Sequence, residues 1–354
     1  MSRIAILSPH GLHEISGNNT TRRRLAAGLR AAGHEVGELS VADAAQRVRS
    51  APRFDLVHAL HALKAGVVAR SITLETGTPY VVSITGTDIN GLAALPERTD
   101  KLLEVLGDAR AVLCASRETI RRLERDAGSR TPMIYVPKGV DLPASPPPLP
   151  QEDRPFVFLH VAGWRPVKNN LFALEPLERL AQEFPSLRLR FAGRVLDEPY
   201  HRKWLRGREA GRWAFSESAG EVAPKAMGRE YAAASVVLNT SHSEGGANAI
   251  LEAMAHGRVV LASDVEGNRA FVRFREDDWT ASTGVLYRTA PSGCPSEREH
   301  DAEDFHRKAR RLLLEPESLR ALSRNALAHI RAEHSPQREI EAVLCGYRLA
   351  GVNV

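Results

Sequence analysis

The 354-residue sequence has few cysteines and no long apolar run. Its three cysteines, Cys114, Cys294 and Cys345, are far apart and form neither a CxxC pair nor another metal-ligand spacing. We therefore expect reduced, mostly buried thiols in a cytoplasmic protein, without a disulfide framework. No stretch approaches the ~20 apolar residues of a membrane span, so none is expected. The N-terminus lacks the apolar region and cleavage site of a signal peptide and is interpreted as a buried strand.

Recognisable nucleic-acid-binding motifs are also missing, although the chain is basic. The 48 lysines and arginines exceed the 43 aspartates and glutamates, which gives a net charge of +5. Aromatic residues make up only 6% of the chain, and no basic stripe is interleaved with them. Small anionic substrates explain an excess of this size, so we expect small-molecule ligands and no nucleic-acid partner.

Short β-branched runs alternate with helical patterns through both halves of the chain. This alternation predicts βαβ units and parallel sheets, and the length favours two domains. The fold class is therefore α/β, with two doubly wound Rossmann-like domains. We predict domains at 1–145 and 150–336, separated by the proline-rich segment Leu142–Pro155, with a last helix, about 337–354, that can pack back on the first domain. Ligands bind outside the carboxyl ends of such strands, so the active site is expected in a cleft that both domains face.

The individual elements follow from the same patterns. The strands predicted in the first half are Ile4–Leu7, Phe54–Ala59, Tyr80–Ile84, Ala111–Cys114 and Met133–Val136. Those predicted in the second half are Phe156–Val161, Leu187–Ala192, Ala234–Asn239 and Val259–Ala262. The predicted helices are Thr20–Ala32, Ala65–Glu75, Asp100–Leu106, Arg117–Ala127, Asn170–Glu183, Asn248–Ala255, Ala302–Leu314, Glu317–His334 and one from Pro336.

The stretch Ser241–Asn268 combines two carboxylates with a glycine turn and a helix start. Glu244 and Glu252 flank the turn, and Asn248 is expected to cap the helix. Free N–H groups at a helix start suit a phosphate, and carboxylates can bind sugar hydroxyls. The alternative for Glu252 alone is a surface carboxylate favoured by the helix dipole. The backbone expected to contact the ligand comprises Gly245, Gly246, Ala247, Asn248 and Ala249.

Two further strand-end loops are assigned to the same site. Arg165 and Lys168 follow the strand Phe156–Val161, where two cations can neutralise a diphosphate and stabilise it as a leaving group. Taken alone, such a pair more often belongs to a solvated loop. The donor-side assignment also includes Gly163, Gly193 and Arg194.

These motifs together resemble the donor-site signature of family 4 retaining glycosyltransferases of the GT-B fold. The resemblance is carried by Glu244-x7-Glu252 and then by Ala255-His256-Gly257, Leu261-Ala262-Ser263-Asp264 and Glu266-Gly267-Asn268. Val136-Pro137-Lys138-Gly139-Val140-Asp141 and the loop from Val161 to Lys168 resemble two other family motifs. The resemblance implies that Glu244 contacts the donor sugar, that the backbone after it holds the diphosphate, and that Glu252 binds the ribose. Arg165, Lys168 and Glu244 are the implied catalytic residues.

The implied reaction is the transfer of a sugar from a nucleotide sugar, UDP-N-acetylglucosamine or UDP-glucose, with retention of configuration. The resemblance implies no metal, no cofactor and no protein nucleophile. Thr85-Gly86-Thr87-Asp88, with the donor motifs, resembles the selenosugar synthases of selenoneine biosynthesis, so selenophosphate is a candidate for a small anionic acceptor. Two alternatives stay open: a GT-B epimerase or hydrolase, and a non-catalytic nucleotide-sugar-binding protein.

The acceptor side is predicted in the first domain. Asn19 or Thr20 is expected to cap the first helix, and arginines 22 to 24 make an anion site there plausible. The alternative is that these arginines line a solvated face, since they point about 100° apart. His58 and His61 have a metal-like spacing without a third ligand, so no metal is predicted. The predicted acceptor-side residues are His10, Gly17, Asn18, Asn19, Arg22, His61, Thr85, Gly86, Thr87 and Asp88.

Overall fold

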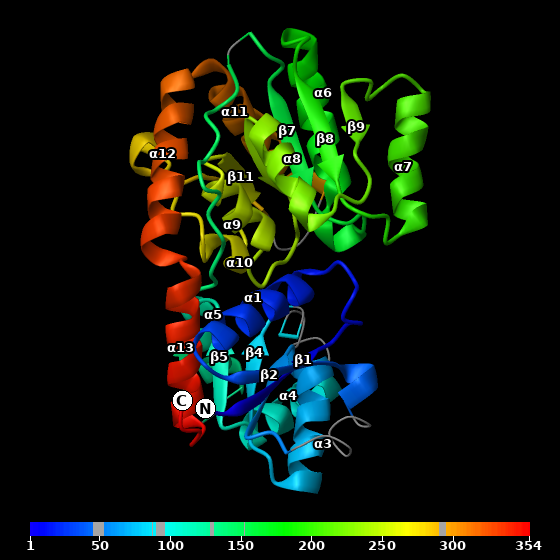
Figure 1. Cartoon of the computed structure of the whole chain (residues 1–354). Coiled ribbons are helices and arrows are strands. Elements are labelled where there is room, and N and C mark those ends of the chain that lie inside the picture. Colours follow the sequence, from blue (N-terminus) through cyan, green and yellow to red (C-terminus); the bar gives the residue numbers. More distant parts are fainter. Residues whose placement is uncertain (45–52, 87, 90–95, 128–130, 152, 290–294) are drawn as a thin grey trace. The chain divides into compact units, whose positions relative to one another are not determined.

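The computed structural model describes residues 1–44, 53–86, 88, 89, 96–127, 131–151, 153–289 and 295–354. They form two compact units, each of which is an α/β layered fold (Figure 1). The first unit comprises Met1–Gly139 together with Glu333–Val354, and the second comprises Val140–Ala332. The chain therefore leaves the first unit once and returns to it with its last helix.

The first unit is built on a six-stranded parallel sheet with the order β2-β1-β3-β4-β5-β6. Its strands are β1 (Arg3–Ser8), β2 (Glu35–Ser40), β3 (Leu56–Leu60), β4 (Tyr80–Ile84), β5 (Ala111–Cys114) and β6 (Met133–Tyr135). Its helices are α1 (Gly17–Ala31), the π-helix η1 (Ala62–Gly66), α3 (Val67–Thr76), α4 (Pro96–Asp108), α5 (Arg117–Ala127) and α13 (Pro336–Leu349).

Two apolar layers cover this sheet, because successive strand residues point to opposite faces. In β1, Ile4 and Ile6 join the core beneath α1 and α13, whereas Ala5 and Leu7 join the core beneath α3 and α4. All four side chains are fully buried. The apolar face of α13, including Val343, completes the first of these layers, so the C-terminal helix is part of the first unit's core.

The second unit has a six-stranded parallel sheet with the order β12-β11-β10-β7-β8-β9. Its strands are β7 (Val157–Val161), β8 (Arg188–Ala192), β9 (Ser216–Ser218), β10 (Val236–Asn239), β11 (Val259–Ser263) and β12 (Val285–Tyr287). Its α-helices are α6 (Leu174–Glu183), α7 (Glu198–Glu209), α8 (Met227–Ala233), α9 (Asn248–Ala255), α10 (Glu266–Arg269), α11 (Pro295–Leu314) and α12 (Pro316–Glu333). Its 3₁₀ turns are η3 (Pro166–Lys168), η4 (Asn170–Ala173), η5 (Pro224–Ala226) and η6 (Trp279–Ala281).

The strand order of the second unit determines where a ligand can bind. Phe158 of β7 faces the core under α6 and α11, while Leu159 faces the core under α8 and α9, so β7 is buried on both sides. From β7 the sheet grows outward through β8 on one side and through β10 on the other. This reversal is the topological switch point, and ligands of open α/β sheets bind beyond the strand ends there. The loops after β7 and β10 are therefore the first place to look for a site.

The segment predicted as a linker, Leu142–Pro155, belongs to the second unit. The buried guanidinium of Arg258 donates hydrogen bonds to the carbonyl oxygens of Pro147 and Pro148, the latter at 2.7 Å. Burial lowers the pKa of Arg258 to about 10. The division between the units falls at Gly139, before the prolines, and the proline-rich segment is held against the body of the second unit.

Candidate functional site

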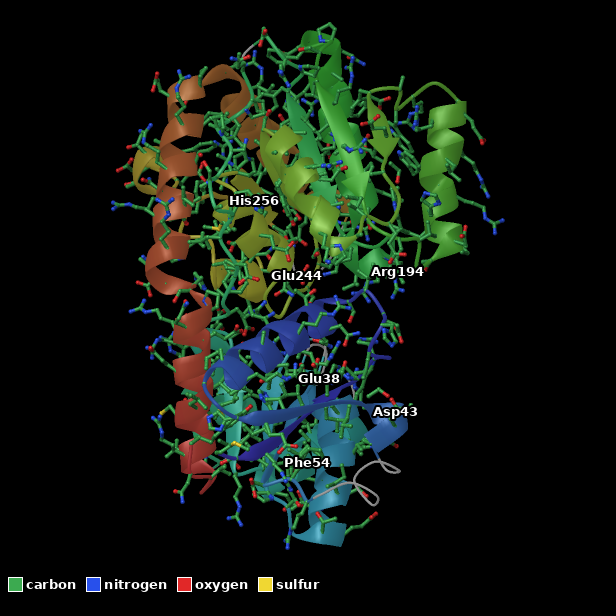
Figure 2. All side chains as sticks on the ribbon, viewed as in Figure 1. Glu38, Asp43, Phe54, Arg194, Glu244 and His256 are labelled. Atoms are coloured by element: carbon green, nitrogen blue, oxygen red, sulfur yellow. The ribbon has the colours of Figure 1, made fainter. Side chains whose placement is uncertain are left out.

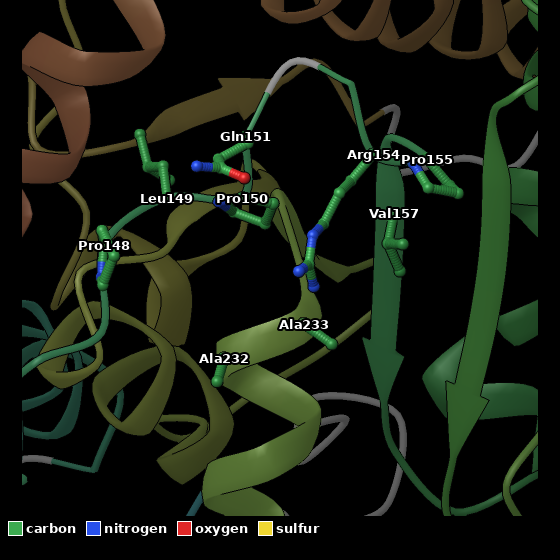
Figure 3. Close-up of a pocket in the computed structure, with 9 residues that line it drawn as sticks. All are labelled: Pro148, Leu149, Pro150, Gln151, Arg154, Pro155, Val157, Ala232 and Ala233. Atoms are coloured by element: carbon green, nitrogen blue, oxygen red, sulfur yellow. The ribbon is translucent and has the colours of Figure 1, made fainter.

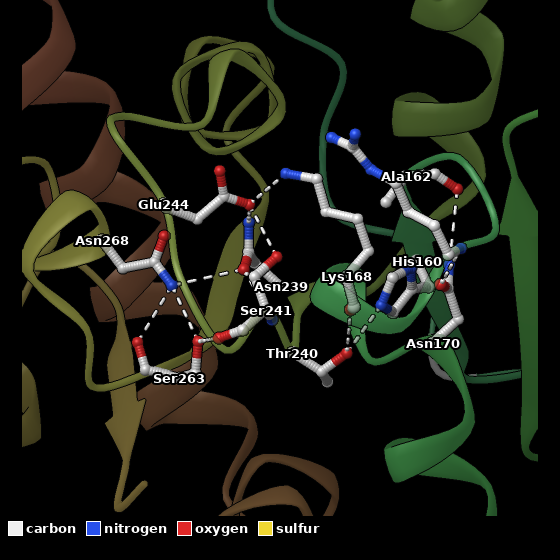
Figure 4. A network of polar contacts seen from close by, with 11 residues as sticks. His160, Ala162, Lys168, Asn170, Asn239, Thr240, Ser241, Glu244, Ser263 and Asn268 are labelled. Carbon is white, nitrogen blue, oxygen red and sulfur yellow. Dashed lines mark hydrogen bonds and ion pairs between the residues drawn. The ribbon is translucent and has the colours of Figure 1, made fainter. Parts of the chain in front are cut away.

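The loops after β7 and β10 meet through a buried ion pair at the switch point (Figure 4). Lys168 Nζ lies 2.6 Å from Glu244 Oε1, and the two side chains are 19% and 7% exposed. Lys168 ends the turn η3, and Glu244 lies in the loop between β10 and α9. The structure thus brings together two predicted catalytic residues that are 76 positions apart in the sequence.

Glu244 is held in its ionised form by three donors. Besides Lys168, Asn239 Nδ2 at 3.1 Å and Ser241 Oγ at 2.6 Å donate hydrogen bonds to Oε1. Burial opposes ionisation of this carboxyl group, but the charge of Lys168 and the three hydrogen bonds outweigh it and lower the pKa of Glu244. Glu244 is therefore an acceptor that a competing hydroxyl group or cation can engage.

A second layer of amides orients Asn239. Its Oδ1 accepts hydrogen bonds from Asn268 Nδ2 at 3.3 Å and from the Ser241 backbone N–H at 3.2 Å. Because Oδ1 faces two donors, Nδ2 must face Glu244. Asn268 is itself fully buried and donates to the carbonyl and hydroxyl oxygens of Ser263, at 2.9 and 3.0 Å. The position of Glu244 thus depends on residues from β10, β11 and α10.

The loop that carries Lys168 is hydrogen-bonded to Thr240, which follows β10, and Thr240 is hydrogen-bonded in turn to His160. The Thr240 hydroxyl lies 2.9 Å from the Asn169 carbonyl oxygen and 3.1 Å from that of Lys168, to which it donates. His160 Nε2 lies 2.8 Å from the same hydroxyl oxygen, which assigns the proton of the neutral ring to Nε2. Burial, with a contribution from Lys168, lowers the pKa of His160 to about 4, so the ring is neutral at pH 7.

The other predicted donor-side residues after β7 and β8 lie in backbone contact with one another. A Cβ atom on Gly193 would lie 2.1 Å from the Ala162 carbonyl oxygen, so only glycine fits between these loops. The Arg194 carbonyl oxygen accepts a hydrogen bond from Trp164 N at 2.9 Å. Arg165 is partly exposed, and its buried Nε has no hydrogen-bond partner among the described residues. A Cβ atom on Gly163 would lie 3.3 Å from the Arg194 carbonyl oxygen, so the loops after β7 and β8 are closely packed there.

The turn that leads into α9 differs from the prediction at its cap. Asn248 is the first residue of α9, and the capping position is Ala247, whose side chain cannot accept a hydrogen bond. The expectation that Asn248 caps the helix is therefore wrong. Gly246 has φ +118°, a conformation that favours glycine, which explains one of the two consecutive glycines.

Glu252 lies on the same helix and faces outward from the core. Its Oε2 accepts a hydrogen bond from the Tyr231 hydroxyl at 2.7 Å. Figure 2 labels Glu244, together with Arg194 and His256 of the same unit. Glu252 and Glu244 are the two ends of the predicted motif, and each accepts a hydrogen bond from a side chain of another element.

A pocket of about 520 Å³ in the second unit lies near the amino-terminal end of β7 (Figure 3). Its walls are mostly apolar, and it includes Val157, which begins β7, and Ala233, which ends α8. The switch-point loops follow the other end of β7. This pocket is therefore separate from the site around Glu244.

In the first unit, Asp88 organises a turn after β4. Its carboxylate accepts backbone N–H hydrogen bonds from Gly86 at 2.7 Å, from Ala62 at 2.9 Å and from Thr85 at 3.1 Å. His61 Nδ1 lies 4.0 Å from the same carboxylate. Burial lowers the pKa of His61, and the charge of Asp88 works against this shift. The predicted acceptor residues Thr85, Gly86 and Asp88 thus lie together, while Thr87 is outside the described residues.

The histidines of this unit do not form a metal site. His58 is fully buried, and its ring nitrogens lie 2.7 Å from the Tyr347 hydroxyl and 2.7 Å from Ser83 Oγ. Burial lowers the pKa of His58 to about 3. His10 lies after β1, with Nδ1 3.8 Å from Glu14. In the ranges that the structure describes, no group of three potential ligands is placed to hold a metal ion.

The start of α1 also differs from the prediction. Ser16 is the N-cap, and its hydroxyl accepts a hydrogen bond from Asn19 N at 3.2 Å, so the expectation of Asn19 or Thr20 is wrong. The helix begins at Gly17 and continues through Asn18. The Asn19 side chain is buried, and its amide donates to two loop carbonyl oxygens.

Two of the three arginines near this helix start have carboxylate partners. Arg22 forms a buried ion pair with Glu38, and Arg24 Nη2 lies 2.8 Å from Glu339 Oε1 on α13. Arg23 is exposed. Because the charges of Arg22 and Arg24 are balanced within the protein, the arginine cluster is a weaker anion site than the sequence indicates.

No helix in the described part of the chain is long and apolar enough to cross a bilayer.

Comparison with known proteins finds a family similarity for the second unit. Residues 155–314, which run from just before β7 to the end of α11, match a family model described as glycosyl transferases group 1. The second unit is thus similar to glycosyl transferases group 1 over these residues. The match includes both switch-point loops, and the prediction of a glycosyltransferase is confirmed.

Relatives of this glycosyltransferase extend the likeness to nearly the whole chain. Glycosyltransferase 1 domain-containing protein 1 of Xenopus tropicalis is 24% identical over 349 residues, which cover 92% of each chain. Sucrose-phosphate synthase of Thermosynechococcus elongatus superposes with a TM-score of 0.82 at 19% identity, covering 98% of both chains. HepE of Anabaena, solved with UDP-glucose, gives a TM-score of 0.78 at 17% identity, covering 99% of this chain and 100% of HepE. These structural likenesses confirm the predicted GT-B fold.

Several residues around the glycosyltransferase site carry no role in the sequence prediction. Asn239 ends β10 and Thr240 follows it, and the sequence prediction gives them no role beyond strand and loop; it gives Tyr231 none either. His160 lies in a strand, where a lone histidine gives no signal. Asn268 occurs in the family-like motif, but its contact with Asn239 depends on the tertiary fold.

Proposed function

We propose that this glycosyltransferase moves a sugar from a UDP-linked donor to a small acceptor. The observation that carries the proposal is the Lys168–Glu244 pair at the switch point of the glycosyltransferase domain. Solved structures of the similar protein HepE contain UDP with glucose, or UDP-glucose. The neighbouring Arg165, whose Nε has no partner among the described residues, supplies a second cation beside Lys168.

The proposed donor complex exchanges one set of ionic contacts for another. On binding, the diphosphate would take the Lys168 ammonium group from Glu244 and pair with Arg165 as well. Glu244, still ionised because Asn239 and Ser241 donate to it, would accept hydrogen bonds from sugar hydroxyls. Two fixed cations aimed at the departing diphosphate stabilise the charge that develops as the glycosidic bond breaks. The backbone of Gly245–Ala249 would complete the phosphate contacts.

We further propose that the reaction retains anomeric configuration and uses no metal or protein nucleophile. The acceptor would attack from the face that the diphosphate leaves, with a phosphate oxygen taking its proton, so the two cations do the work of charge neutralisation. The donor is UDP-N-acetylglucosamine or UDP-glucose. The acceptor is a small anion, and selenophosphate is the one that the family resemblance of the Thr85–Asp88 region indicates.

The experiment has two stages. Thermal-shift measurements with UDP-, GDP- and ADP-sugars identify the donor, because a ligand stabilises the folded state that binds it. Mass spectrometry with and without selenophosphate then identifies the product, and NMR gives its anomeric configuration. A sugar–acceptor conjugate supports transfer. Free sugar in every reaction would indicate a hydrolase, and an epimerised nucleotide sugar would indicate an epimerase. Donor binding without any reaction would indicate a binding protein.

A further inference from the structure

Helix α9 presents a single carboxylate from an otherwise apolar surface. From Ile250 to Ala255 every residue except Glu252 is buried. The buried residues of the helix pack against β7, β10 and β11 in the core of the second unit. The backbone of Glu252 is therefore held firmly, and the freedom that remains lies in its own side-chain torsions.

Tyr231 restricts that freedom. It projects from α8, is 1% exposed, and donates its hydroxyl proton to Glu252 Oε2 across 2.7 Å. Its ring centroid lies 5.0 Å from that of His256, and His256 Nδ1 lies 2.8 Å from the backbone carbonyl oxygen of Glu252. Burial and the nearby charge of Glu252 raise the pKa of Tyr231 well above its ordinary value, so the hydroxyl remains a donor at physiological pH.

The contact leaves part of the carboxylate available. Among the described residues, Tyr231 provides the hydrogen bond to Oε2, and no described donor is hydrogen-bonded to Oε1. An ionised carboxylate offers about four lone-pair positions, so a vicinal pair of hydroxyl groups can still bind it. Tyr231 thus holds one oxygen and leaves the other without a hydrogen bond from a described donor.

We propose that Tyr231 is a positioning residue that sets Glu252 for the two ribose hydroxyls of the donor and makes the site selective for ribonucleotides. This inference rests on the proposed function, in which Glu252 binds the ribose. Without the tyrosine hydroxyl, Glu252 would have to be ordered by the ligand, and that ordering reduces affinity. A nucleotide without ribose hydroxyls gains nothing from an ordered Glu252, so its affinity does not depend on Tyr231.

Isothermal titration calorimetry with two ligands tests this dependence. The ligands are UDP and 2′,3′-dideoxyuridine diphosphate, measured with the wild type, Tyr231→Phe and Glu252→Gln. Tyr231→Phe keeps the ring and its packing on His256 and removes only the hydrogen bond. The control is Tyr347→Phe, which removes a buried hydroxyl group from the first unit, where it is bonded to His58.

We expect Tyr231→Phe to weaken UDP binding about ten- to a hundredfold, the loss of one hydrogen bond to a charged group. Binding of the dideoxy ligand should change less than about twofold, and Tyr347→Phe should bind both ligands as the wild type does. An equal loss for the two ligands, or none for UDP, overturns the role of Tyr231. Unchanged UDP affinity in Glu252→Gln would contradict the assignment of Glu252 to the ribose. That result would count against the proposed donor site itself and not only against the role of Tyr231.

Discussion

Replacing Lys168 with methionine tests the central ion pair, because it removes the ammonium charge and keeps most of the side-chain volume. At 2.6 Å the attraction between Lys168 and Glu244 is about 6 kcal/mol in an effective dielectric of ~20, before the cost of burying both charges. Breaking a buried pair from one side typically costs 3–5 kcal/mol, and the partial exposure of Lys168 favours the lower end. We expect Lys168→Met to lower the free energy of unfolding by about 3 kcal/mol at neutral pH.

The loss should depend on pH in a defined direction. In the wild type the folded-state pKa of Glu244 is lowered, so the pair contributes stability above the ordinary pKa of a glutamate, and this contribution is lost as pH falls through the folded value. In the variant, burial of Glu244 acts without Lys168 and raises its pKa, so the folded state gains protons and stability falls as pH rises. The difference between the two proteins is therefore smallest in acid and grows toward neutral pH.

Tryptophan fluorescence during urea unfolding measures this difference in the correct unit, because all four tryptophans lie between residues 140 and 332. Lys168→Met/Glu244→Gln, which leaves no unpaired charge, should recover part of the loss. The exposed pair Arg179–Glu303 provides a control, and Arg179→Met should change stability little. A loss for Lys168→Met of less than about 1 kcal/mol, or one that is the same at pH 4 and pH 7.5, would refute the reasoning.

Three further outcomes are expected. Gly193→Ala places a methyl group 2.1 Å from a carbonyl oxygen and should lower the stability of the second unit by at least about 2 kcal/mol in urea unfolding, whereas Gly107→Ala, with open space around its Cβ, should not. Ser16→Ala removes the cap of α1 and should cost about 1 kcal/mol by circular dichroism; no loss would show that the cap is dispensable. Lys168→Ala should weaken UDP binding in calorimetry, most strongly at low ionic strength, and a salt-independent loss would contradict a charge contact with the diphosphate.

Most of the fold could be predicted from local patterns, and the failures have local causes. The strand Ala111–Cys114 and the helices Arg117–Ala127 and Asn248–Ala255 occur with the predicted bounds, because buried runs and amphipathic stripes are strong signals. Strand β2 is absent from the predicted strands because its short edge sequence, Glu35–Ser40, lacks a regular alternation of apolar and polar residues. Helix α7 was missed because only Trp204 of its residues is buried, which leaves no apolar stripe.

The candidate site likewise has residues that local motifs indicate and contacts that depend on the tertiary fold. The sequence indicates Glu244 and Lys168 because each follows a recognisable strand within a motif. The contact between Lys168 and Glu244, and the contacts of Asn239 and Tyr231, depend on the order of the strands in the sheet. Local sequence patterns do not predict that strand order. The carboxylate partners of Arg22 and Arg24 could not be predicted either, because they come from β2, which is not among the predicted strands, and from the last helix.

The hydrogen bonds between Arg258 and the proline-rich segment affect where a truncated fragment of the second unit should begin. The recognisable family signature begins at residue 155, yet the two carbonyl groups that accept hydrogen bonds from Nη2 of the buried Arg258 belong to Pro147 and Pro148. A fragment trimmed to the signature would keep this cation and lose two of the carbonyl oxygens to which it donates. The second unit therefore extends beyond its family signature on the N-terminal side and begins at Val140.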